Sequence, residues 1–162
     1  MSEGVTKAPT FELTDVEGRR YRLHDALSAG PLLLVFIKTG CPACHLAAPY
    51  LRRLREVYPQ TGWNLWAISQ DPADASRAFA AQHEWTFPVL VDAPSLAVSR
   101  AFDPPGTPTY YLIAPSGDVE AVTTSFSKSD LNSIAERIAT AVGAAPTVVA
   151  PPGDGNPDFK PG

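Results

Sequence analysis

Residues 39–49 read TGCPACHLAAP and contain the two cysteines of the 162-residue chain, Cys41 and Cys44, followed directly by His45. Two chemistries use the pattern C-x-x-C-H. In the first, both thiols attach a c-type haem and the histidine binds its iron. In the second, the two thiols cycle between the dithiol and the disulfide. The segments that surround the motif distinguish the two.

The motif lies between an expected strand and an expected helix. Residues 31–37 form a continuous apolar run, as in a strand buried on both faces. From Pro42 to about residue 58, apolar residues recur with helical spacing. The first N–H groups of a helix lack intrahelical partners, and the helix dipole places partial positive charge there. A thiolate at Cys41 would be stabilised by this position, whereas Cys44, one turn further, should be less exposed. We therefore predict that Cys41 attacks and Cys44 resolves.

The rest of the chain alternates strands and helices. An N-terminal hairpin turns at residues 15–18, and Asp71 is the expected N-cap of a helix that has Pro72 at its first position. Ser127 and Asp130 have the spacing of a capping box before the last helix. Further expected strands are 63–69, 87–92, 110–114 and 119–123, and further expected helices are 72–82 and 95–102. This order predicts an α/β fold whose central sheet is mostly parallel, ends in an antiparallel pair and is covered by helices on both faces.

These motifs resemble those of the redoxin branch of the thioredoxin fold, which includes thioredoxin-like thiol–disulfide oxidoreductases and AhpC/TSA-like peroxiredoxins. The resemblance covers residues 9–143. CPACHLAAPYL is similar to the family's C-x-x-C helix, including the kinking Pro49, and FPVLVD lies in an insert typical of redoxins. The resemblance implies a thioredoxin-like fold with an N-terminal β-hairpin, a redoxin-type insert and a mixed central sheet.

The resemblance also implies a substrate-binding loop at GTPT, residues 106–109. In the family this loop holds a cis-proline against the two cysteines, here Pro108, and the backbone of the preceding residue, here Thr107, pairs with the substrate strand. Gly40 and Pro42, which flank Cys41, are assigned to the same surface. His45 and Lys38 are candidates for lowering the pKa of the Cys41 thiol through their positive charge.

The sequence departs from the family's patterns in three respects. Gly40 stands where thioredoxin-like relatives usually carry tryptophan. Val35 and Ala47 match the positions at which many relatives have a buried carboxylate, so the group that deprotonates Cys44 is unassigned. Peroxiredoxins carry proline seven residues and threonine or serine three residues before the reactive cysteine, where this chain has Leu34 and Lys38. The peroxidase site is therefore expected to be absent.

Composition argues against other classes of protein. A net charge of −4 without a basic stripe disfavours nucleic-acid binding, and the longest apolar run, residues 32–37, is too short to span a membrane. His24 and His83 supply no second paired spacing for zinc, and no other metal or cofactor is expected. A c-type haem would need export and a second axial ligand, and the one methionine is Met1, so haem is disfavoured but not eliminated.

The two ends of the chain lead to separate expectations. The start, MSEGVTKAPTFELTD, has no apolar core of a signal peptide, which favours a cytoplasmic location. Residues 1–143 are expected to form one domain. Residues 144–162 contain five prolines and three glycines and are expected to be a disordered tail.

The function predicted from these features is thiol–disulfide exchange at the C-P-A-C motif. Substrates would be disulfides of proteins or small thiol compounds, and a reductase or a small thiol would donate electrons. A peroxiredoxin-like thiol peroxidase and a non-catalytic thioredoxin-fold binding module are the two alternatives.

Overall fold

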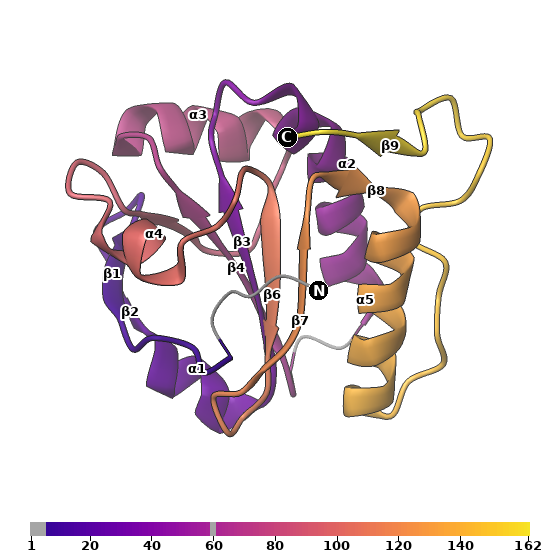
Figure 1. Cartoon of the computed structure of the whole chain (residues 1–162), viewed down its shortest axis with the longest axis horizontal. Coiled ribbons are helices and arrows are strands. Elements are labelled where there is room, and N and C mark those ends of the chain that lie inside the picture. Colours follow the sequence, from indigo (N-terminus) through magenta and orange to yellow (C-terminus); the bar gives the residue numbers. More distant parts are fainter. Residues whose placement is uncertain (1–5, 59–60) are drawn as a thin grey trace.

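The computed structural model describes residues 6–58 and 61–162, and a seven-stranded sheet forms its centre (Figure 1). The strands follow the order β2-β1-β5-β4-β3-β6-β7 across the sheet. Their bounds are β1 Glu12–Asp15, β2 Arg20–Arg22, β3 Leu32–Ile37, β4 Asn64–Ser69, β5 Val89–Val91, β6 Thr109–Ile113 and β7 Val119–Thr124. A separate two-stranded sheet pairs β8, Phe126–Ser127, with β9, Phe159–Lys160. The helices are α1 Leu23–Ala29, α2 Pro42–Val57, α3 Ala73–Gln82, α4 Ala97–Phe102 and α5 Lys128–Val142.

The thioredoxin-like α/β architecture with its N-terminal hairpin and mixed sheet is confirmed, but the sheet is less parallel than expected. Strands β3, β4 and β5 run parallel to one another. Strand β1 joins β5 antiparallel, and β6 joins β3 antiparallel. The expectation of a mostly parallel sheet is therefore wrong. Apolar patterning indicates how deeply a strand is buried, but it does not indicate the direction in which the strand enters the sheet.

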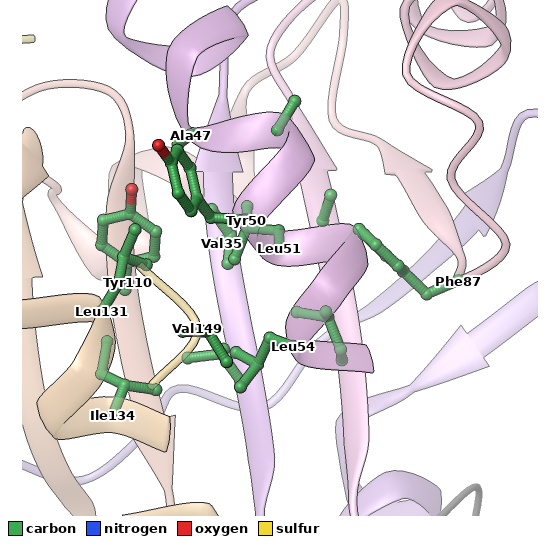
Figure 2. Packing of buried hydrophobic residues seen from close by; sticks show 14 of the residues in the cluster. Val35, Ala47, Tyr50, Leu51, Leu54, Phe87, Tyr110, Leu131, Ile134 and Val149 are labelled. Atoms are coloured by element: carbon green, nitrogen blue, oxygen red, sulfur yellow. The ribbon is translucent and has the colours of Figure 1, made fainter. Parts of the chain in front are cut away.

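Each face of the sheet carries its own hydrophobic core. Alternate residues of β3 point to opposite faces, because side chains alternate along a strand. Leu33, Val35 and Ile37 pack under α2 and α5, whereas Leu34 and Phe36 pack under α1 and α4. Figure 2 shows the first core from close by, with side chains of α2, α5 and the sheet meeting between the layers. All six residues of β3 are buried, as the continuous apolar run predicts.

Helix α1 was not expected from the sequence, which indicated only the end of a hairpin there. Its buried residues Leu23, Ala26 and Leu27 have the spacing of one helical face. With seven residues, however, the helix is too short to give a clear periodic signal. Its stability comes from packing on the sheet rather than from local propensity.

The expectation that residues 144–162 are disordered is wrong, because this segment packs along α2 and α5. The Val149 side chain is fully buried in the first core, where Figure 2 places it beside Leu54 and Ile134. Arg53 of α2 donates to the Val149 carbonyl at 2.6 Å. Asn132 of α5 donates to the Ala150 carbonyl at 3.0 Å and accepts from its N–H at 2.9 Å. Composition missed this order because the partners lie on other elements of the fold.

Among the residues that the structure describes, no helix combines the length and apolar character needed to cross a membrane.

Candidate active site

The two cysteines lie where β3 passes into α2, as the sequence predicts. Cys41 is the N-cap of α2 with extended backbone angles, and Pro42 occupies the first helical turn, where its missing N–H costs no hydrogen bond. The Cys41 sulfur accepts a hydrogen bond from the backbone N–H of Cys44 at 3.2 Å. The helix start thus directs its unpaired N–H groups at the sulfur of Cys41.

The Cys41 thiol is partly exposed and more acidic than an ordinary cysteine. Burial opposes its ionisation, but hydrogen bonds from the Cys44 and Thr107 side chains and from the backbone of Cys44 and Ala43 outweigh burial, so the pKa of Cys41 is lowered. The Cys41 side chain is therefore suited to act as a thiolate nucleophile.

The Cys44 thiol has the opposite character. Its residue is 1% exposed. Burial, together with hydrogen bonding to Cys41, raises the pKa of Cys44 to about 12. A single turn of helix therefore holds one accessible, acidic thiol beside one buried, weakly acidic thiol. This difference corresponds to the predicted order of attack and resolution.

The loop before β6 lies against the dithiol. The Thr107–Pro108 bond is cis, as expected, and the Thr107 carbonyl lies 3.3 Å from the Cys41 sulfur. Two contacts fix the loop: the Pro108 carbonyl accepts from the Ser125 N–H at 2.8 Å, and the Thr109 hydroxyl donates to the Gly106 carbonyl at 2.6 Å. A second cis bond, Ala93–Pro94, was not expected.

Gly40 and Pro42 are exposed on either side of Cys41. A Cβ atom added at Gly40 would meet no atom of the surrounding structure within 4 Å. The structure therefore brings Gly40, Cys41, Pro42 and Thr107 together at one end of the sheet.

His45 and Lys38 are not among the groups that shift the pKa of Cys41. His45 is directed towards α3, where its Nδ1 lies 2.8 Å from Nε2 of His83. Its Nε2 lies 2.7 Å from the Thr39 carbonyl. Because a carbonyl can only accept, His45 Nε2 carries a proton. The Lys38 side chain is exposed.

The geometry of His45 also bears on the haem alternative. Both ring nitrogens of His45 are hydrogen-bonded, so binding to iron would break one of these contacts. Cys44 is too buried for its sulfur to be joined to a haem without opening the core. Within residues 6–58 and 61–162, no three His, Cys, Asp or Glu side chains lie close enough together to hold a metal ion.

Sequence reasoning missed Asp71 as a part of the site. Asp71 was expected to cap α3, but Pro72 is the N-cap residue and makes no side-chain capping bond. The Asp71 carboxylate instead accepts from the N–H of Thr39 at 2.7 Å and from its hydroxyl at 2.9 Å. Asp71 thereby holds the turn that leads into Cys41. The available signal was its position two residues after β4, since the ends of β4 and β3 lie side by side in parallel register.

Tyr110 is the second residue that the sequence did not indicate. It lies on β6 directly opposite Val35 of β3 and belongs to the same buried cluster as Cys44. Burial raises the pKa of the Tyr110 hydroxyl, and the nearby Cys44, Cys41 and Asp130 raise it further.

Known proteins of the same fold carry related chemistry. The chain is 32% identical over 133 residues to the thiol-disulfide oxidoreductase ResA of Geobacillus kaustophilus, a match that covers 81% of this chain and 75% of that protein. A structure from Chlorobium tepidum assigned as a thiol:disulfide interchange protein DsbE superposes with a TM-score of 0.77 at 26% identity, covering 88% of this chain and all of the other. The peroxidoxin BcpB of Mycobacterium tuberculosis superposes with a TM-score of 0.69, also at 26% identity, over 88% of this chain and 97% of the other.

The model of the AhpC/TSA family matches residues 5–122, which include the C-P-A-C motif and the loop that holds Pro108. With its thioredoxin-like fold and its dithiol at the start of α2, the chain belongs to the AhpC/TSA family of redoxins.

Proposed function

We propose that this thiol–disulfide oxidoreductase reduces disulfides in extended polypeptide segments through the ordered action of Cys41 and Cys44. The Cys41 thiolate attacks one sulfur of the substrate disulfide, and the other substrate sulfur leaves as a thiolate and takes up a proton. Cys44 then loses its proton and attacks the Cys41 sulfur. This step forms the Cys41–Cys44 disulfide and releases the second substrate thiol, so that two electrons pass to the substrate.

The difference between the two thiols carries this proposal. Cys41 is partly exposed and has a lowered pKa, whereas Cys44 is 1% exposed and its pKa is raised to about 12. A substrate disulfide can reach the first sulfur and not the second. Because little of Cys44 is ionised near neutral pH, resolution of the mixed disulfide is expected to be slower than its formation.

The loop at Thr107 supports a docking site for the substrate. Its carbonyl lies 3.3 Å from the Cys41 sulfur, so a segment that pairs with the Thr107 backbone would bring its cysteine to the nucleophile. Gly40 and Pro42 would border the same segment. A disulfide-containing protein is therefore the proposed substrate, and a reductase or small thiol is the proposed electron donor.

Substitution of each cysteine tests the order of events. Cys41→Ser should abolish disulfide reduction, and Cys44→Ser should accumulate a mixed disulfide with the substrate, visible by mass spectrometry. Reduction of insulin by a dithiol donor is a suitable assay. Equal trapping of substrate by both variants would contradict the assigned order.

A thiol peroxidase is the second candidate, and the superposition with the peroxidoxin BcpB is the observation that favours it. In that reaction a peroxide would oxidise Cys41 to a sulfenic acid, and Cys44 would condense with it and release water. The two peroxiredoxin positions are occupied here by Leu34, which is fully buried, and by the exposed Lys38. We therefore expect insulin reduction to exceed peroxide turnover. Rapid peroxide consumption that depends on Cys41 would instead favour the thiol peroxidase over the disulfide reductase.

A binding module without catalysis remains the third reading, and failure of Cys41 to react with a disulfide probe at neutral pH would favour it. The cytoplasmic location stays a prediction of the sequence.

A further inference from the structure

Residues 159–162, here called the strap, reach the loop that holds Pro108. Phe159 and Lys160 form β9 and pair with β8, and the N–H of Gly162 lies 3.3 Å from the Ser125 hydroxyl oxygen, which accepts its hydrogen bond. A methyl group added to Gly162 would lie 2.0 Å from the Thr107 carbonyl oxygen and 2.8 Å from its carbon. The backbone of the strap is thus in direct contact with the backbone of Thr107. In Figure 1 the end of the chain lies beside the start of α2.

The contact matters because the same carbonyl faces the nucleophile. The Thr107 carbonyl oxygen lies 3.3 Å from the Cys41 sulfur, and Thr107 as a whole is 7% exposed. Cys41 nevertheless keeps part of its surface open to solvent. The strap therefore covers the backbone edge beside the nucleophile and leaves the nucleophile itself reachable.

The segment before the strap is firmly attached. The buried ammonium of Lys128 donates to the Asp154 carboxylate at 2.6 Å, to the Pro151 carbonyl at 3.0 Å and to the Asn156 carbonyl at 3.1 Å. The Tyr50 hydroxyl donates to the same carboxylate. Hydrogen bonding to Lys128 lowers the pKa of Asp154, so this anchor is charged at neutral pH.

The strap itself is held by fewer contacts. Its β9 pairing spans two residues, and the Phe159 side chain is 58% exposed. A short, exposed segment that few contacts hold can detach while the rest of the fold stays intact.

We propose that the strap determines substrate specificity by occupying the place at which a polypeptide substrate pairs with Thr107. The proposal rests on the proposed function, since it takes Cys41 as the attacking thiol. A protein disulfide must displace the strap before its chain can dock, whereas a small disulfide without flanking chain reaches Cys41 directly. Only molecules with a displaced strap can bind protein substrates. The apparent affinity for these substrates is therefore the intrinsic affinity multiplied by the fraction of molecules whose strap is displaced.

Two variants that remove the contact test the proposal. Gly162→Ala places a methyl group against the Thr107 carbonyl and should push the strap away, and deletion of residues 159–162 removes it while leaving Asp154 and Asp158 in place. Phe159→Ser is the matched control, because it alters an exposed side chain of the strap and leaves Gly162 unchanged. Each variant is assayed with insulin and with hydroxyethyl disulfide.

We expect kcat/KM for insulin to rise about fivefold in both variants. A rise of this size follows if the variants remove a closed state that is stabilised by the equivalent of one hydrogen bond. The rate with hydroxyethyl disulfide should change by less than about twofold, since that substrate does not need the docking edge. An unchanged or lower insulin rate in Gly162→Ala would overturn the proposal, as would an equal rise for both substrates. If the deletion unfolds the protein, Gly162→Ala decides alone.

Hydrogen exchange gives a readout that does not depend on turnover. In the Cys44→Ser background, the amides of Phe159, Lys160 and Gly162 should exchange faster in the mixed disulfide with a cysteine peptide than in the mixed disulfide with mercaptoethanol. Equal exchange in the two adducts would refute displacement of the strap. If no mixed disulfide forms with either compound, the proposed function fails instead, so the two failures are distinguishable.

Discussion

Val35 and Tyr110 lie opposite one another on β3 and β6, and the Tyr110 hydroxyl is buried without a hydrogen-bond partner among the described residues. Val35 stands where many thioredoxin-like relatives carry a buried carboxylate. The neighbouring hydroxyl does not replace that carboxylate as a base, because burial and nearby Cys44 raise the pKa of Tyr110 well above its ordinary value. It can donate a hydrogen bond, but it holds its proton at neutral pH.

Tyr110→Phe should therefore leave the protein as stable as the parent or make it more stable by about 1 kcal/mol. Removal of a buried polar group that has no partner relieves its desolvation cost and keeps the ring in place. Urea unfolding of the reduced protein measures the change in unfolding free energy. A loss of more than about 1 kcal/mol would show that the hydroxyl has a partner in solution, such as a buried water.

The alkylation rate of the reduced protein should rise with pH through a single ionisation, whose pKa lies below the ordinary cysteine value of about 8.5. Because the pKa of Cys44 is raised to about 12 and that of Cys41 is lowered, reaction with iodoacetamide below pH 9 reports on Cys41 alone. In Cys44→Ala the hydrogen bond from the Cys44 side chain is lost, so the inflection should move to higher pH. A parental inflection at 8.5 or above would contradict the acidity assigned to Cys41.

Stability of the reduced protein should decrease as the pH rises above about 8.5. The unfolded chain releases the Cys44 proton near that pH, but the folded protein retains it until the pKa of about 12. Above pH 8.5 the folded state thus binds more protons than the unfolded state, and unfolding becomes easier by at most about 1.4 kcal/mol per pH unit. Urea unfolding between pH 8 and 9.5 measures the slope.

Cys44→Ala supplies the control for that slope, because it keeps Cys41 and removes the buried thiol. Cys41 acts in the opposite direction, since its lowered folded-state pKa adds stability as the pH rises towards 8.5. Equal slopes for the parent and Cys44→Ala would show that the buried thiol does not titrate as assigned.

The dithiol could be located from sequence because its placement depends on local features. The buried run of β3, the proline after Cys41 and the periodicity of α2 all lie within about twenty residues of the motif, so they specify the helix start directly. The position of Pro108 in the site could not be predicted from local features. It lies far from Cys41 in sequence, and only the resemblance to redoxins placed it beside the cysteines.

The features that sequence reasoning missed depend on contacts between distant segments. Residues 144–162 have a composition typical of disorder, and their order comes from Arg53, Lys128 and Asn132 on α2 and α5. Composition records what a segment can bury by itself and not which partners the fold brings to it. The same limit applies to Asp71, whose local context suggested a helix cap while its partner lies 32 residues away.

The last prediction concerns Asp71, which should position the Cys41 turn. Its carboxylate accepts two hydrogen bonds from Thr39, at 2.7 and 2.9 Å, and Thr39 also provides the carbonyl that binds His45. Asp71→Ala leaves the Thr39 N–H and hydroxyl without these acceptors. Hydrogen bonds to a charged group contribute about 1.5–3 kcal/mol each, so unfolding free energy should fall by about 2 kcal/mol or more.

Insulin reduction by Asp71→Ala should fall by more than the loss of folded protein explains. A loosened turn misplaces the attacking sulfur relative to Thr107, and kcat/KM for insulin should decrease about tenfold at a temperature where the variant is folded. Asp74→Ala is the matched control, since Asp74 lies three residues further along, in the first turn of α3, with its side chain 99% exposed and bonded to Arg77. Asp71→Asn, which keeps an oxygen acceptor, should recover part of both losses. If Asp71→Ala matches the Asp74 control in unfolding free energy and in insulin reduction, Asp71 does not position the turn.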